Sequence, residues 1–178
     1  MRPAFLACAF ALVAAPAVAQ DADLDALFDA LRAPDATSWE AIEDRIWDAW
    51  SQSGSAAMDL LLERGRDAIQ EGEHEAAIEH LTALVENAPD FAEGWSARAT
   101  AFFHADLFGP ALSDIGRTLT LEPRHFGAIA GLGRILEETG DLDAALAAYR
   151  EAVAIHPHRA DLREAVERLE AELQGKNI

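Results

Sequence analysis

Apolar residues recur at helical spacing along most of the chain, and beyond about residue 57 the whole pattern repeats. Their side chains stand three, four or seven residues apart, which places them on one face of a helix. Three prolines follow one another at intervals of 34 residues, at Pro89, Pro123 and Pro157. A repeat of this length predicts stacked helix pairs, because one pair cannot bury its apolar face alone. We therefore expect three units within residues 58–157, at residues 58–91, 92–125 and 126–159.

Small residues occupy matching places in the three units. Each predicted first helix has one early, at Gly65, Ala99 and Gly133, and each second helix has an alanine midway, at Ala77, Ala111 and Ala145. Antiparallel helices need small side chains where their backbones approach most closely, since a bulky one would force them apart. Gly65 otherwise costs a helix about 1 kcal/mol relative to alanine. We therefore expect these positions to be the helix contacts.

The predicted turn inside each unit also recurs, as Gly72-Glu73, Asp106-Leu107 and Gly140-Asp141. Glycine readily adopts the left-handed conformation that ends a helix, and an acidic residue after it is favoured where the next helix begins. The second unit lacks this glycine and carries Gly109-Pro110 three residues later. Its turn is therefore expected to have a different shape.

Together these features resemble the tetratricopeptide repeat family. The third unit matches the family pattern best, with Gly133, Gly140, Ala145, Tyr149, Ala152 and Pro157. The first unit departs from it at Ala68 and Leu84, and the second at Asp106 and Thr118. The resemblance covers residues 58–157 and implies an all-α, right-handed superhelix of helix pairs whose concave side binds peptides or proteins.

The resemblance also implies a binding surface, because family ligands lie along the first helix of each pair. By register, this surface presents Leu62, Arg66, Ile69, Ser96, Thr100, Phe103, Ala130, Arg134 and Glu137. Phe103 with His104 is the candidate apolar anchor, and burial of both between repeats is the alternative. The family's clamp for a carboxyl terminus uses lysines, arginines and asparagines. This surface offers only Arg66 and Arg134 of that kind, so we expect no such clamp.

Residues 1–19 have the pattern of a signal peptide. Arg2 supplies a positive start, an uncharged apolar run extends from Phe5 to Ala15, and Ala17-Val18-Ala19 is a cleavage pattern of small residues. The run is short for a bilayer span. We predict cleavage before Gln20 and a periplasmic or secreted protein without stable membrane insertion. An uncleaved anchor is the alternative.

Two further helices are predicted in residues 20–55. The first carries Leu24, Leu27, Phe28 and Leu31 on one face, and the second carries Trp39, Ile42, Ile46, Trp47, Ala49 and Trp50. Thr37 and Glu40 have the spacing of a capping box at the start of the second. The tryptophans either cover the exposed apolar face of the first unit or form an exposed docking anchor.

The segment 158–178 is predicted to close the array. Ala160 to Gln174 is amphipathic, with Leu162, Ala165, Val166, Leu169 and Leu173 on one side. Such a helix covers the last repeat and turns its polar face outward. The predicted all-α fold thus has two leading helices, three helix pairs and one capping helix.

Catalytic motifs are missing from the sequence. It contains no Gly-x-Ser-x-Gly elbow, no phosphate-binding glycine loop and no dinucleotide fingerprint. The six histidines are interpreted as surface or turn residues, and no metal or cofactor is expected. The formal net charge of −18 argues against nucleic acid and anionic lipid as partners. It permits a basic partner, although it also suits a solvated acidic surface.

The sequence therefore predicts a non-catalytic scaffold that takes a segment of a protein or peptide partner into the groove of the repeats. The main alternative is a structural, self-associating subunit of an envelope complex that assembles through the tryptophan-rich leading helix. A hydrolase in the leading helices is a weaker alternative, since carboxylates such as Asp44 and Asp48 have no visible catalytic partner.

Overall fold

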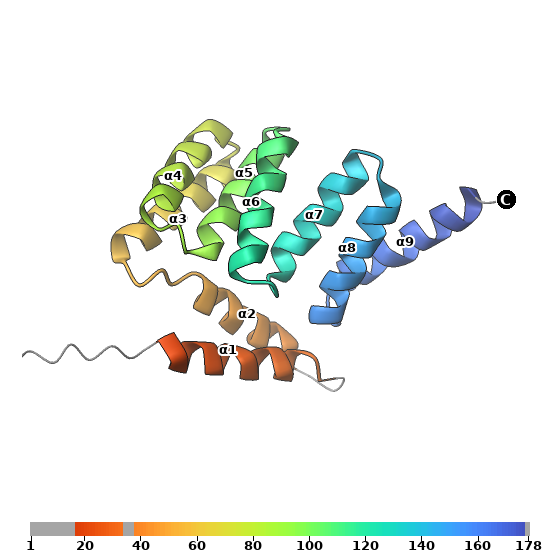
Figure 1. Ribbon diagram of the computed structural model, residues 1–178, viewed down its shortest axis with the longest axis horizontal. Coiled ribbons are helices and arrows are strands. Elements are labelled where there is room, and N and C mark those ends of the chain that lie inside the picture. The colour runs from red at the N-terminus through yellow and green to blue at the C-terminus, as the bar shows by residue number, and fades with distance from the viewer. Residues whose placement is uncertain (1–16, 34–37, 177–178) are drawn as a thin grey trace, which may run out of the picture.

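The computed structural model describes residues 17–33 and 38–176, and all regular secondary structure in these ranges is helical. The helices, shown in Figure 1, are α1 (Ala17–Leu31), α2 (Trp39–Trp50), α3 (Ala56–Glu71), α4 (His74–Asn87), α5 (Ala92–His104), α6 (Phe108–Leu121), α7 (Phe126–Glu138), α8 (Leu142–Ile155) and α9 (Ala160–Lys176). This arrangement confirms the predicted all-α fold of two leading helices, three pairs and a final helix.

Helices α3 to α8 form three antiparallel pairs that stack side by side (Figure 1). Small residues lie where the helices of a pair meet. A Cβ added to Gly65 would overlap the side chain of Leu81, and one added to Gly133 would lie 3.0 Å from the ring of Tyr149. Ala99 is likewise buried. The small residues therefore allow the close helix contacts that were predicted from them.

The turns inside the three pairs have one shape. Gly72 and Gly140 adopt φ values of 77° and 84°, and Asp106 adopts the same left-handed region with φ 57°. In the second pair the Leu107 N–H donates to the Phe102 carbonyl at 2.9 Å. Equivalent bonds close the other two turns, from Glu73 to Ala68 at 2.8 Å and from Asp141 to Leu136 at 2.9 Å. The expectation of a different second turn was wrong, because aspartate tolerates this conformation better than most residues.

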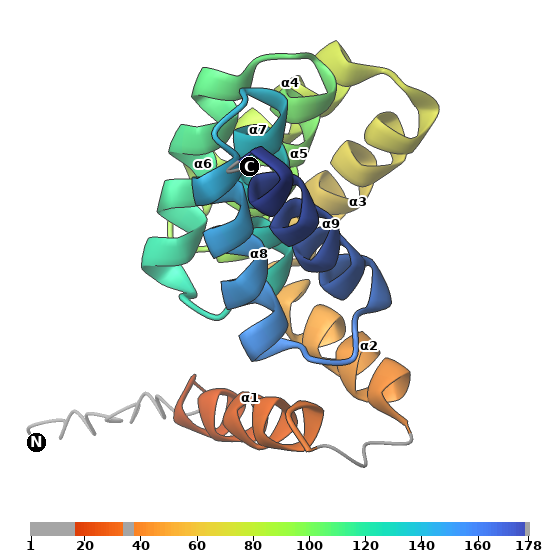
Figure 2. The same cartoon turned by 90° about the vertical axis from the view of Figure 1, so that its right-hand side faces the viewer.

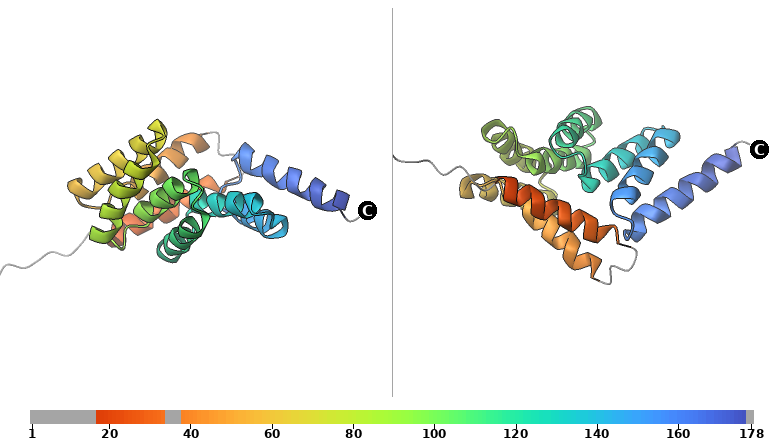
Figure 3. Two further views of the ribbon diagram at one scale, coloured as in Figure 1. Left: turned by 90° about the horizontal axis from the view of Figure 1, so that it is seen from above. Right: turned by 60° about the horizontal axis from the view of Figure 1, so that its bottom comes forward.

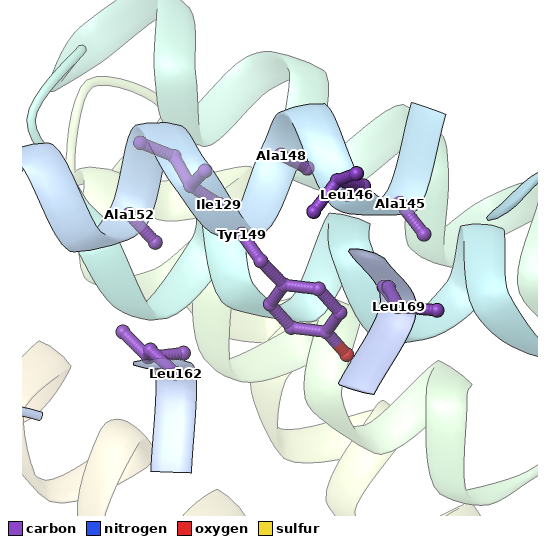
Figure 4. Close-up of a cluster of buried hydrophobic side chains, with 8 residues drawn as sticks. All are labelled: Ile129, Ala145, Leu146, Ala148, Tyr149, Ala152, Leu162 and Leu169. Atoms are coloured by element: carbon purple, nitrogen blue, oxygen red, sulfur yellow. The ribbon is translucent and has the colours of Figure 1, made fainter. Parts of the chain in front are cut away.

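Helix α9 closes the array at its carboxyl-terminal end. The ring of Tyr149 extends from α8 toward α9, where Leu162 and Leu169 lie on either side of it (Figure 4). These two leucines are 3% and 0% exposed. The last pair therefore shares its hydrophobic core with α9.

The leading helices lie somewhere other than predicted. Helix α2 does not cover the outer face of the first pair; α1 and α2 lie together across the turns between α6 and α7 and between α8 and α9 (Figures 2 and 3). Phe28 and Ile46, both fully buried, form one cluster with Phe126 at the start of α7. The physical reason is that these turns present aromatic rings that match the tryptophans of α2.

The amino terminus of the sequence is only partly described. Most of the predicted signal peptide, residues 1–19, lies outside the described residues, as does Thr37 of the predicted capping box. Helix α2 begins after Ser38, which makes no side-chain capping bond. Among the described helices, none combines the length and apolar composition required to cross a membrane.

Candidate functional site

Two adjoining hollows lie between α2 and the first helices of the pairs, α3, α5 and α7. Their volumes are about 540 Å³ and 230 Å³. The linings of both include Trp47, Ser96, Thr100 and Gly127, so the hollows adjoin at these residues. We call the two together the inner groove and its parts the first and second hollows.

Most of the residues predicted from the family register line this groove. Those in the first hollow are Arg66, Ile69, Ser96 and Thr100, and those in the second are Ser96, Thr100, Phe103, His104, Ala130 and Arg134. Phe103 is half-buried and His104 is exposed, so the two are not buried between repeats. The structure places both side chains in the lining of the groove, and their role in binding stays a prediction.

Two residues of the predicted set lie elsewhere. Leu62 is only 2% exposed, because it lies one helical turn before Gly65 on the face of α3 that packs against α4. Glu137 points toward the capping helix, where it pairs with Arg168. Neither side chain is available to a partner in the inner groove.

A buried carboxylate organises the first hollow. Glu93 is 4% exposed, and its Oε1 accepts a hydrogen bond from Arg66 Nη2 at 2.7 Å. Arg66 also donates to the Ser51 hydroxyl at 3.0 Å. A buried charge is tolerated only when it is paired and hydrogen-bonded. Arg66 is therefore a structural residue as well as a lining residue of the groove.

His125 holds the second oxygen of Glu93. Its Nε2 lies 2.8 Å from Glu93 Oε2, and its Nδ1 accepts the N–H of Ala128 at 3.1 Å. Because Nδ1 accepts this bond, the ring proton lies on Nε2 and is donated to Glu93. His125 thereby caps the start of α7 and links it to α5.

Sequence reasoning missed the burial of two histidines. His125 and His156 were interpreted as surface or turn residues; both lie at turns, but each is 0% exposed. His125 stacks on Trp50, and His156 packs edge-on against Trp39 at a centroid distance of 5.5 Å. No sequence spacing links residues that lie so far apart in the chain. The only signal for such partners was the number of aromatic residues in the leading helix.

Sequence reasoning also did not assign Trp47 to the groove. Its indole N–H donates to Glu43 Oε1 at 3.2 Å, which fixes the ring against α7. A Cβ added to Gly127 would lie 2.8 Å from this ring, so glycine makes room for it. The leading helix therefore borders the groove without filling it.

Glu43 connects α2 to the turn after α8. Its carboxylate lies 3.2 Å from Arg159 Nη1 and 3.3 Å from His156 Nε2, although the His156 contact lacks the angles of a hydrogen bond. Burial lowers the pKa of His156 below its ordinary value of 6.5, against the smaller opposing effect of Glu43. His156 is thus held neutral beneath the leading helices.

The described residues, 17–33 and 38–176, contain no cluster of three or more histidine, cysteine, aspartate or glutamate side chains placed to hold a metal ion. The chemistry that the inner groove offers is instead recognition, through aromatic rings, hydroxyls and arginines.

Known proteins share both this sequence pattern and this fold. The tetratricopeptide repeat family model matches residues 62–117 and 108–160. A TPR repeat-containing protein of Rhizobium etli is 37% identical over 155 residues, which cover 85% of this chain and 75% of the relative. The BBSome complex member bbs-4 of Caenorhabditis elegans is 31% identical over 110 residues, which cover 56% of this chain and 23% of that protein.

Solved structures agree with the family model at the level of the fold. The first TPR domain of Spaghetti (RPAP3), bound to an HSP90 peptide, has a TM-score of 0.64 and 21% identity, covering 67% of this chain and 95% of that chain. A MamA mutant has a TM-score of 0.55 and 16% identity, covering 88% of this chain and 89% of that one. From the family model and the Rhizobium relative, this chain belongs to the tetratricopeptide repeat family.

Proposed function

We propose that this protein is a non-catalytic interaction scaffold that binds an extended segment of a partner protein in the inner groove. The observation that carries the proposal is that the two hollows adjoin along α3, α5 and α7. In an extended chain, alternate residues point the same way and lie about 6.6 Å apart. Such a segment can place neighbouring anchors in two adjoining hollows.

Structural neighbours support a binding role without naming the partner. The RPAP3 domain is bound to an HSP90 peptide, and the TPR2B domain of yeast Sti1 is in complex with pHsp70. Their identities to this chain are 21% and 16%, so the likeness concerns the fold. We carry over the mode of action, a preformed groove for a peptide segment, and leave the partner open.

A steric block in the groove tests the proposal. Thr100 is exposed and borders both hollows, and its hydroxyl bonds only the Ser96 carbonyl of its own helix, at 3.1 Å. Thr100→Trp should therefore fill the groove without removing a packing contact. Thr120→Trp is the matched control, because Thr120 is also exposed and bonds the Gly116 carbonyl in the same way, at 2.8 Å, on α6.

The two variants and the unchanged protein are used as bait in an extract of the source cells, with equal helical content verified by circular dichroism. We expect a partner that is captured by the unchanged protein and by Thr120→Trp but lost with Thr100→Trp. Identical capture by all three baits would contradict binding in the inner groove.

Self-association through the leading helix is the competing function. In the structure Trp50 is 8% exposed, and Trp39 and Trp47 pack against rings of the repeats. These contacts are intramolecular, which leaves no exposed tryptophan cluster for a second copy. Light scattering of the purified protein decides the matter, since a stable oligomer that Thr100→Trp leaves intact would favour the competing function.

We also propose that the protein is exported to the periplasm or secreted, on the basis of the pattern in residues 1–19. Fractionation of the source cells followed by amino-terminal sequencing tests this. We expect a mature chain that begins at Gln20, and a cytoplasmic chain that begins at Met1 would overturn the proposal.

A further inference from the structure

Two aromatic residues and several small residues line the second hollow, which we call the slot. Trp47 and Phe103 both line it, and α7 contributes the small residues Gly127, Ala128, Ala130 and Gly131 as well as Arg134 and Ile135. Glycine and alanine bring the backbone of α7 close to whatever enters the slot. Two aromatic rings and several small residues in one lining suit an aromatic side chain, because aromatic pairs gain from edge-on or offset contact.

The charged side chains in the lining of this slot are positive. Its lining contains Arg134 and Arg159 and no aspartate or glutamate. Arg159 is already paired with Glu43 and Asp161. Arg134 is exposed, and no carboxylate within 4 Å pairs with it among the residues that the structure describes; the nearby Glu137, whose pKa its charge helps to lower, pairs with Arg168 instead.

The guanidinium of Arg134 lies 5.9 Å from the centroid of the Phe103 ring. The cation is therefore held at the edge of the aromatic slot. The chain as a whole carries a formal net charge of −18. An acidic segment is thus repelled by most of the surface and attracted at this point, which directs it into the groove.

We infer that the second hollow holds an aromatic side chain from an extended, acidic partner segment, with a carboxylate next to that ring paired to Arg134. The inference rests on the proposed function and names the class of partner. It also departs from the basic partner that the net charge alone permits. Trp47, one wall of the slot, lies outside the residues matched by the family model, so the pocket depends on the leading helix.

Peptide probes test the inference directly. The parent probe is a fluorescein-labelled Gly-Ser-Glu-Phe-Glu-Ser-Gly peptide, blocked at its carboxyl end as an amide. One comparison peptide replaces phenylalanine with alanine, and another replaces both glutamates with lysines. In fluorescence anisotropy with the full chain, we expect each replacement to weaken binding about tenfold or more, as loss of a ring contact or a charged hydrogen bond does.

Protein variants assign the effect to the slot. Phe103→Ala and Arg134→Gln are each expected to weaken binding of the parent probe about tenfold, and Arg134→Gln should shrink the preference for glutamate over lysine. Arg117→Gln is the control, because Arg117 is a partly exposed arginine of α6 that pairs with Asp90 away from the groove. It should bind the parent probe like the unchanged protein.

Three results would overturn the inference: equal affinity for the three peptides, tighter binding of the lysine peptide, or no binding by any of them. A parent peptide that binds only with a free terminal carboxylate would also overturn it, since the cation would then recognise a chain end. These failures are distinct from failure of the scaffold function, because loss of a captured partner with Thr100→Trp would still stand.

Discussion

The imidazole of His125 lies parallel to the indole of Trp50, with the ring centroids 4.2 Å apart and the planes 7° from parallel. This contact joins the leading helices to the turn between α6 and α7. At its edge, the same imidazole is hydrogen-bonded to Glu93, which in turn binds Arg66 in the groove. The position of α2 and the shape of the first hollow are therefore connected by one ring.

Removal of the Trp50 ring should destabilise the protein. Trp50→Ala is expected to lower the free energy of unfolding by about 3–5 kcal/mol, because a large buried ring leaves a cavity. Trp50→Phe should lower the free energy of unfolding by less, since it keeps a ring on His125 and removes an indole N–H that is buried without a partner. Urea denaturation measures both. Leu60→Ala, at a site that is 45% exposed, should change stability by only about 0.5 kcal/mol, and an equal loss there would contradict the prediction.

Two helical glycines should respond to alanine in opposite ways. In Gly65→Ala the new methyl group collides with Leu81, which should destabilise the protein by about 1–3 kcal/mol despite better helix propensity. Gly116 lies in α6 with nothing within 4 Å of an added Cβ, so Gly116→Ala should stabilise by about 0.5–1 kcal/mol. Thermal unfolding compares the two, and stabilisation by both variants would show that the Gly65 contact is not tight.

The left-handed conformation of Asp106 predicts how its turn tolerates substitution. Asp106→Gly should leave stability nearly unchanged, because the relief of strain offsets the greater freedom of the unfolded chain. Asp106→Val should destabilise by about 1–2 kcal/mol, since a branched side chain is strained at φ 57°. A difference in melting temperature between the two variants is the measurement. Equal melting temperatures would argue against the left-handed turn.

The burial of His156 predicts that acid weakens the fold. The folded protein binds this proton only at a pH below the ordinary pKa of 6.5, whereas the unfolded chain binds it near 6.5. The unfolded state therefore carries the extra proton in acid, so the stabilisation is complete above pH 6.5 and is lost as the pH falls below it. The slope is at most about 1.4 kcal/mol per pH unit.

Denaturation at a series of pH values compares the unchanged protein with His156→Gln, which should have a flatter profile below pH 6.5. His80→Gln on α4, away from the leading helices, is the control for the replacement of a histidine by glutamine as such. The carboxyls of Glu137 and Asp161 have lowered pKa values, chiefly through hydrogen bonds from Arg168 and Arg159, and their stabilisation is lost only in stronger acid. A profile of His156→Gln that matches the unchanged protein would contradict the prediction.

The repeats could be predicted from the sequence because their contacts are local and periodic. Gly65, Gly133 and the recurring prolines mark helices that meet their neighbours along the chain. The surface residues followed from the same register, and only Leu62 and Glu137 of that set face elsewhere. The second turn was misjudged because aspartate at position 106 takes the conformation that glycine has in the other units.

The placement of the leading helices could not be predicted for a physical reason. The tryptophans of α2 indicate that a large apolar partner exists, but any exposed face of the repeats could supply it. Apart from Phe126, the ring partners that the repeats supply are His125, His156 and His158, polar residues in turns, where a pattern of apolar spacing gives no signal. Trp47 was consequently missed as a wall of the groove.

The contacts of α1 and α2 also determine the order in which the molecule can be completed. Arg124 bonds Asp25, 99 residues earlier, and His158 bonds the Ala33 carbonyl, 125 residues earlier. Stacked repeats ordinarily fold by short-range steps from one unit to the next. Here α1 and α2 can dock fully only after residues 124–158 have been made, so the groove acquires its Trp47 wall late in synthesis. An incomplete chain therefore has no finished binding site.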